Sequence, residues 1–200
     1  MSEDLSPNAP RKNHIDLLRT LLSRDVGSLV PHSSEEWKAV EDAFGFQFPT
    51  SYRATCDVIP GGALGEAMAW SSPFSDDAST NLNKERLTQE YGDSQRFSEV
   101  ALYPAIPGYL IFATTSMRIS LSYLIEKDST GRANCSSEVF LIDGEVDEVV
   151  GSQMEVDELI YRCITNNPPL VEELSKTIFE WEFKDSHFPL FRYIRSMDDE

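Results

Sequence analysis

Apolar residues recur at helical spacing near both ends of the chain, whereas the middle carries short apolar and β-branched runs. The helical spacing predicts helices over residues 14–24, 33–45, 49–59, 152–165 and 169–183. The short runs, separated by Pro, Gly and polar residues, predict strands over residues 100–103, 109–114, 119–126, 137–142 and 146–150. Helices before and after a block of strands predict an α+β fold, with an antiparallel sheet of about five to six strands packed against N-terminal and C-terminal helices.

Three segments lie outside this pattern. Residues 1–12 are polar and contain proline, so we expect a flexible N-terminal tail and assign residues 13–200 to a single domain. Residues 63–98 give no clear periodicity: 71–79 has the composition of a loop, and 83–91 fits a short helix. After the last predicted helix comes a tail rich in aromatic residues, with Phe188, Phe191 and Tyr193.

Local signals define the ends of the second and third predicted helices. Ser33 or Ser34 is a suitable N-cap for the second helix, and Gly45 is a suitable stop. Pro49 suits the first turn of the third helix, because the missing N–H has no partner to lose there. The sequence Pro60-Gly61-Gly62 ends that helix, and its two glycines permit a tight turn with positive φ.

The composition is that of a folded protein without export or membrane signals. Of the 200 residues, 40% are hydrophobic and 10% are aromatic, which is enough for a core. The N-terminus lacks the features of a secretory signal, and no apolar run approaches the roughly 18 residues of a membrane helix. Cys56, Cys135 and Cys163 have no spacing typical of disulfide frameworks or zinc sites. We therefore expect a cytoplasmic protein with reduced thiols that does not bind membranes.

Net charge is the most unusual bulk property. The 34 acidic and 17 basic residues give −17 at pH 7, a charge that repels nucleic acid and steers basic proteins toward the surface. No Lys or Arg lies between Arg132 and Arg162, where acidic residues are frequent. From this stretch and the loop around residues 70–77 we select candidate partner-binding residues: Trp70, Asp76, Asp77, Glu145, Asp147, Glu148, Glu155, Asp157 and Glu158. The alternative is that the acidic stretch is an ordinary solvated surface that serves solubility.

The sequence contains no signature of catalysis, and we predict no catalytic residue, metal or cofactor. The motif G-x-S-x-G is absent, and the three cysteines and three histidines have no catalytic spacing. Residues 143–147 resemble the start of a calcium loop, but Glu148 and Met154 stand where that loop needs Gly and Glu. The glycines of residues 60–65 lack the strand and Lys of a phosphate-binding loop. A small-molecule enzyme centred on residues 63–98 remains an alternative.

One spaced group of residues resembles the opening of the SUKH superfamily. In that family a helix with a Trp and a Glu ends at a Gly, an apolar-Pro step starts a helix with Tyr-Arg, and a glycine pair follows. The matching residues here are Trp37, Glu41, Gly45, Pro49, Tyr52, Arg53, Gly61 and Gly62. Segments similar to the family's strands are residues 103–114, 120–123 and 138–150. The resemblance covers about residues 30–165, and it departs from the family at Ala113 and Tyr123, where Gly and Trp are usual.

The resemblance implies a domain that binds proteins without catalysis. Such domains are most often bacterial immunity proteins that neutralise a cognate toxin, often a nuclease, whereas eukaryotic relatives regulate cell-wall assembly and signalling. We therefore expect an immunity protein whose partner is a cognate basic toxin domain. The alternative is an intracellular regulatory or scaffold protein of the cell-wall assembly regulator type. For the chain itself we expect a monomer or weak homodimer.

The physical role expected for the motif residues is structural. Large aromatic side chains on short helices bury much apolar area against a sheet, so we expect Trp37, Phe44, Phe48 and Tyr52 to pack there. Glu41 follows Trp37 by one helical turn, and its carboxylate can either cap a loop or pair with Arg53.

Overall fold

The computed structural model describes residues 13–26, 31–64, 68–91, 96–97, 100–115, 119–143 and 148–165. The helices of this part are α1 (His14–Val26), α2 (Ser34–Phe44), α3 (Thr50–Cys56), α4 (Lys84–Tyr91) and α5 (Val156–Thr165). The strands are β1 (Gly62–Leu64), β2 (Met68–Trp70), β3 (Arg96–Phe97), β4 (Val100–Ala101), β5 (Gly108–Thr115), β6 (Ile119–Lys127), β7 (Ala133–Asp143) and β8 (Glu148–Gly151). The predicted N-terminal tail, the helix at 169–183 and the aromatic tail lie outside the described residues.

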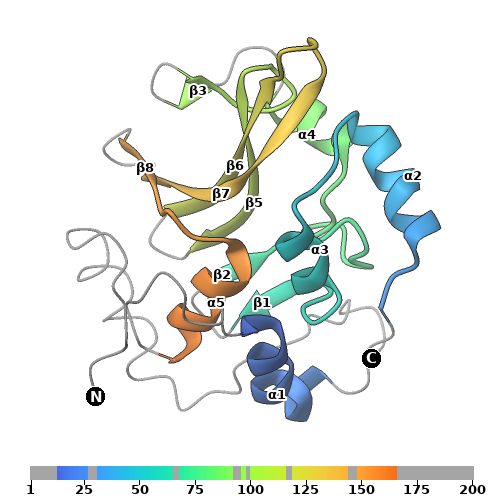
Figure 1. Cartoon of the computed structure of the whole chain (residues 1–200), viewed down its shortest axis with the longest axis vertical. Coiled ribbons are helices and arrows are strands. Elements are labelled where there is room, and N and C mark those ends of the chain that lie inside the picture. Colours follow the sequence, from blue (N-terminus) through green and yellow to red (C-terminus); the bar gives the residue numbers. More distant parts are fainter. Residues whose placement is uncertain are drawn as a thin grey trace.

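A six-stranded antiparallel sheet in the order β1-β2-β5-β6-β7-β8 forms the centre of the fold (Figure 1). This confirms the predicted α+β class and antiparallel sheet. Residues 100–103 were predicted as a strand of this sheet, but they join it only through a bridge from Leu102 to Tyr109 of β5. Residues 100 and 101 form β4, which pairs with β3 in a separate two-stranded sheet. Strands β1 and β2 were not predicted, because each contains only three residues and shows no readable alternation.

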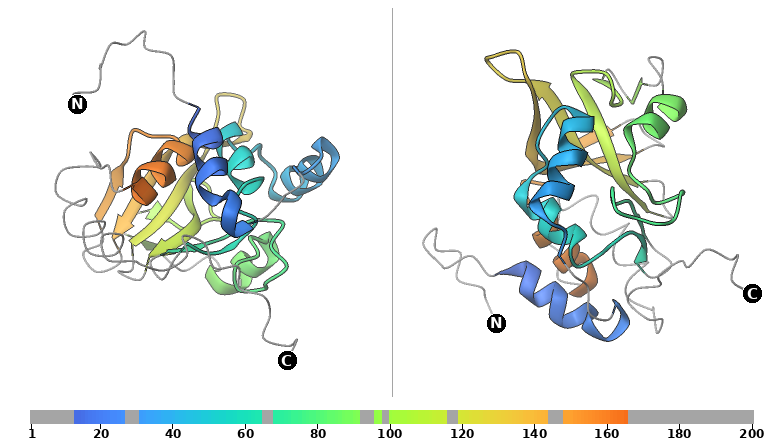
Figure 2. Two further views of the ribbon diagram at one scale, coloured as in Figure 1. Left: turned by 90° about the horizontal axis from the view of Figure 1, so that it is seen from below. Right: turned by 90° about the vertical axis from the view of Figure 1, so that its right-hand side faces the viewer.

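Helices α1, α3 and α5 contact one another and lie over one face of the sheet (Figure 2). Their apolar residues and those of the strands form the main core, in which Tyr52 of α3 packs against strand residues. Its ring centroid lies 5.4 Å from that of Phe112 and 5.8 Å from that of Tyr123. These side chains are fully buried, which makes the aromatic cluster the contact between the helical layer and the sheet.

Helix α2 has the ends that the sequence predicts. The Oγ of Ser33 accepts the N–H of Glu36, and the Glu36 carboxylate accepts the N–H of Ser33, which completes a capping box. Gly45 ends the helix in the left-handed region at φ +86°, and its N–H donates to the carbonyl of Glu41.

Two predicted helices are shorter than their sequence patterns indicate. The third, predicted over residues 49–59, ends at Cys56, and Pro49 occupies its N-cap position rather than its first turn. The last, predicted from residue 152, begins at Val156. Residues 152–154 are bound to β7 instead: Ser152 donates its N–H to the carbonyl of Val139, and the Val139 N–H donates to the carbonyl of Met154. Hydrogen bonds to the sheet therefore displace the helix start.

Candidate binding groove

Three of the residues that carry the SUKH resemblance, Trp37, Tyr52 and Arg53, pack together with Phe48, the apolar residue of the apolar-Pro step. The ring of Trp37 lies 5.9 Å from that of Phe48 and 6.4 Å from that of Tyr52, centroid to centroid. The guanidinium carbon of Arg53 lies 5.2 Å from the centroid of the Trp37 ring, a cation–π arrangement. Trp37 and Tyr52 are buried, as expected from the sequence.

Glu41 fulfils both roles that the sequence left open. Its Oε1 accepts the N–H of Phe48 at 3.0 Å and lies 3.7 Å from the Nη1 of Arg53. The carboxylate thereby satisfies a backbone donor in the loop after α2 and neutralises the cation above Trp37. The two glycines of the motif also behave as predicted, since Gly61 and Gly62 both have a φ of +128°.

The thiol of Cys56 and the phenols of Tyr52 and Tyr123 lie within the core, and the thiol of Cys135 packs against it. Burial raises the pKa of the Cys56 thiol to about 12, and it also raises the pKa of Cys135. Burial raises the pKa of Tyr52 and Tyr123 well above the ordinary value for tyrosine. These groups therefore stay protonated at neutral pH, and Cys56 and Cys135 are free thiols that are poor nucleophiles.

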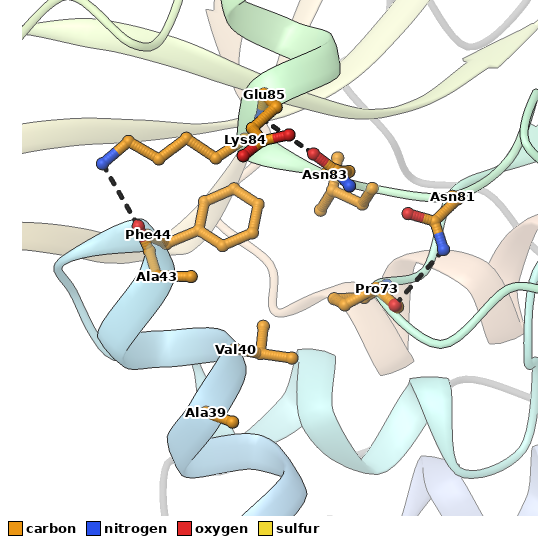
Figure 3. Close-up of a pocket in the computed structure, with 10 residues that line it drawn as sticks. Ala39, Val40, Ala43, Phe44, Pro73, Asn81, Asn83, Lys84 and Glu85 are labelled. Atoms are coloured by element: carbon orange, nitrogen blue, oxygen red, sulfur yellow. Dashed lines mark hydrogen bonds between the residues drawn. The ribbon is translucent and has the colours of Figure 1, made fainter.

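An open groove of about 490 Å³ lies between α2 and the segment leading into α4 (Figure 3). Apolar side chains line both sides of it: Ala39, Val40, Ala43 and Phe44 come from α2, and Pro73 and Leu82 come from the facing segment. Ala39 and Ala43 are exposed, and Val40 is half-buried. Because these three side chains are short, the helix surface there is shallow and accessible to another molecule.

The wall that faces α2 also carries polar side chains. Asn83 caps α4: its Oδ1 accepts the N–H groups of Glu85 at 2.8 Å and Arg86 at 3.3 Å. Asn81 donates its Nδ2 to the carbonyl of Ser75 at 2.6 Å. At one end, the Nζ of Lys84 donates to the carbonyl of Ala43 at 3.1 Å, so that this lysine joins the two walls (Figure 3). That bond also satisfies a carbonyl in the last turn of α2.

The three candidate partner-binding residues of the loop differ in exposure and contacts. The proposal that Trp70 contacts a partner is wrong, because its side chain is 0% exposed and packs against Tyr52 and Phe112. Asp76 is exposed. The Oδ1 of Asp77 accepts the hydroxyl and the N–H of Ser79, each at 2.7 Å, and these hydrogen bonds lower its pKa. Asp77 therefore has a local structural role in the turn.

The acidic residues chosen from the later stretch are only partly placed. Glu155, Asp157 and Glu158 lie at the start of α5 and are partly exposed. Glu148 begins the edge strand β8. Glu145 and Asp147 lie outside the described residues. The structure therefore brings three of the selected carboxylates together at one helix N-terminus.

Asp157 is half-buried, and its desolvation raises the pKa of its carboxyl group above the ordinary value of about 3.9. The folded protein then binds this proton more tightly than the unfolded chain does. The stabilising contribution of protonation is complete below about pH 3.9 and is lost as pH rises through the folded pKa. We expect Asp157→Asn to raise the urea midpoint at pH 7 and to raise it less near pH 4. An equal change at both pH values would contradict this assignment.

In the part of the chain that the structure describes, no group of three or more His, Cys, Asp or Glu side chains is arranged to hold a metal ion. The described helices also include none that is long and apolar enough to cross a membrane. Comparisons with protein-family models, curated proteins and solved structures gave no match to this chain.

The groove was not among the sites predicted from the sequence. Its walls come from α2 and from residues 73–85, which belong to the segment whose periodicity could not be read. The available signal was the pair Ala39 and Ala43, one turn apart on a helix whose other apolar residues are large.

Proposed function

We propose that this chain is a non-catalytic protein-binding domain of the SUKH type, and that it acts as an immunity protein that binds and neutralises a toxin. The observation that carries the proposal is the packing of several of the resemblance residues into one unit. Trp37, Glu41, Phe48 and Arg53 are linked by ring contacts, a backbone hydrogen bond and an ion pair. Such contacts are expected if the spacing reflects a shared structural motif.

Electrostatics favours a basic partner. The chain carries 34 acidic and 17 basic residues, and a surface of one sign accelerates encounter with the opposite sign more than it increases final affinity. A cognate toxin with a basic surface, such as a nuclease domain that binds nucleic acid, has the required complementarity. Occlusion of that surface by the acidic domain would neutralise the toxin.

This mechanism predicts strongly salt-dependent association. Charge reversal at Glu145, Asp147 and Glu148 should reduce the association rate constant by about tenfold at low salt, with a smaller effect on dissociation. Raised salt should reduce the difference in association rate constant between variant and wild type, because it screens charges beyond the Debye length. Stopped-flow association with the purified toxin domain measures both effects. Equal association rates for variant and wild type would show that the acidic stretch is not part of the interface.

A genetic experiment separates immunity from the alternative of a cell-wall assembly regulator. For an immunity protein, deletion of the gene should be lethal only while the cognate toxin is present. Removal of the toxin gene should restore growth. A growth or wall defect that persists without any toxin would instead support the regulatory role and overturn the immunity proposal.

A further inference from the structure

We propose that the groove between α2 and residues 73–85 binds an extended segment of a partner protein, in which an apolar side chain is flanked by Lys or Arg. The inference rests on the proposed protein-binding function and names the chemistry of the segment that is bound. Three independent features of the groove support it: its apolar lining, its uncommitted amide groups and the charge of its surroundings.

The apolar lining of the groove can contact one large aliphatic side chain. Ala39 and Ala43 are exposed, Val40 is half-buried, and Pro73 faces them across the groove (Figure 3). A volume of about 490 Å³ is in the range of sites that hold small ligands. A Leu, Ile or Met side chain in this space would cover apolar surface on both sides and remove it from water.

The wall that faces α2 can recognise a peptide group. Among the contacts of the described residues, the Oδ1 of Asn81 accepts no hydrogen bond and the Nδ2 of Asn83 donates none, although the other amide atoms of both side chains are engaged. One carboxamide thus offers an acceptor and the other a donor, at positions two apart in the chain. An extended peptide presents a matching N–H and C=O beside its side chain, whereas a helix uses these groups internally.

The charges around the groove select basic flanking residues. Helix α2 and residues 73–91 together contain eight acidic and three basic residues. Among the contacts of the described residues, Lys38 is paired with a carboxylate, that of Asp42, whereas Lys84 and Arg86 donate to backbone carbonyls. The acidic residues therefore outnumber the basic ones by five, and the surroundings of the groove carry a net negative charge.

Three exposed carboxylates lie on the two segments that form the groove. Glu35, Asp76 and Glu85 are exposed, and within the described part of the chain their carboxylates have no hydrogen bond or ion pair. Glu85 lines the groove itself. Lys or Arg on either side of the apolar anchor would therefore meet a net negative charge, whereas acidic flanking residues would be repelled.

The test uses the full chain, labelled with ¹⁵N, and short synthetic peptides with one Leu between lysines. We expect this peptide to shift the amide resonances of Ala39–Phe44 and Asn81–Glu85. Peptides with Ser in place of Leu, or with Glu in place of Lys, should bind about tenfold more weakly, which corresponds to about 1.4 kcal/mol. Absence of shifts in the groove, or equal binding of the three peptides, would overturn the inference.

Substitutions that fill the groove provide the second arm. Ala39→Gln and Ala43→Gln add length without charge at exposed helical positions, where Gln is well tolerated. The double variant should bind the Leu peptide about tenfold more weakly, whereas Ala78→Gln, at an exposed residue that does not line the groove, should bind it normally. If the double variant still forms the complex with the protein partner at full affinity, the groove inference fails while the proposed function stands.

Discussion

Replacement of Trp37 by Ala is expected to lower the free energy of unfolding by about 3 to 5 kcal/mol. The side chain is 2% exposed, and its ring makes an edge contact with Phe74 at 4.8 Å as well as its contacts with Phe48 and Tyr52. Truncation leaves a cavity between α2, α3 and the loop after β2. It also removes the ring beneath the Arg53 guanidinium. Urea denaturation followed by far-UV circular dichroism measures the loss.

Two further variants make this prediction specific to the buried ring. Lys38→Ala, at the next residue of α2, removes an exposed side chain and should change stability by no more than about 0.5 kcal/mol. Trp37→Phe keeps an aromatic ring, so its free energy of unfolding should lie between those of the wild type and Trp37→Ala. This variant gives a measurable value even if the alanine variant is largely unfolded. A loss below about 1 kcal/mol for Trp37→Ala would contradict the placement of this residue in the core.

Gly61→Ala should destabilise the protein by about 2 to 4 kcal/mol, because two penalties act at this residue. Its φ of +128° is a conformation that residues with a side chain rarely adopt. A Cβ atom at this position would also lie 2.6 Å from the Cβ of Ser75, well inside van der Waals contact. The Ser75 side chain cannot easily move away from the new Cβ atom, because its Oγ is hydrogen-bonded to the Oγ1 of Thr80 at 2.6 Å.

Two comparisons separate the strain from the steric clash. Gly131 has a φ of +82° but open space around it, so Gly131→Ala should cost only about 1 kcal/mol. In a Ser75→Gly background the atom nearest to the new Cβ would be the Cα of residue 75, at an ordinary 3.5 Å. Gly61→Ala should therefore cost at least about 1 kcal/mol less there than in the wild type. If the losses of stability from Gly61→Ala and Ser75→Gly are additive, a steric clash between residues 61 and 75 is excluded.

The elements that the sequence predicts well are those with strong local signals. Helix α2 has an N-cap serine, a capping glutamate and a terminal glycine, and its predicted ends agree with the structure. Strands β5 and β6 have eight and nine residues of mainly apolar and β-branched character, long enough to be recognised without knowledge of their partners. In these segments local preference and tertiary packing favour the same structure.

Other features depend on contacts between distant segments. Trp70 was grouped with the loop around residues 70–77, yet pairing of β2 with β5 buries its side chain. The start of α5 is fixed by hydrogen bonds to Val139, which no local pattern reveals. The groove likewise joins segments about forty residues apart, as the bond from Lys84 to Ala43 shows.

Binding of one protein partner is the central claim, and affinity capture with the immobilised chain tests it most directly. Partners would be eluted from lysate of the source organism with rising salt, identified by mass spectrometry and purified for titration. We predict a single basic toxin domain that elutes at raised salt, binds with one-to-one stoichiometry and loses its activity in the complex. Recovery of endogenous kinases, wall enzymes or scaffold proteins, with no toxin among them, would contradict the immunity role.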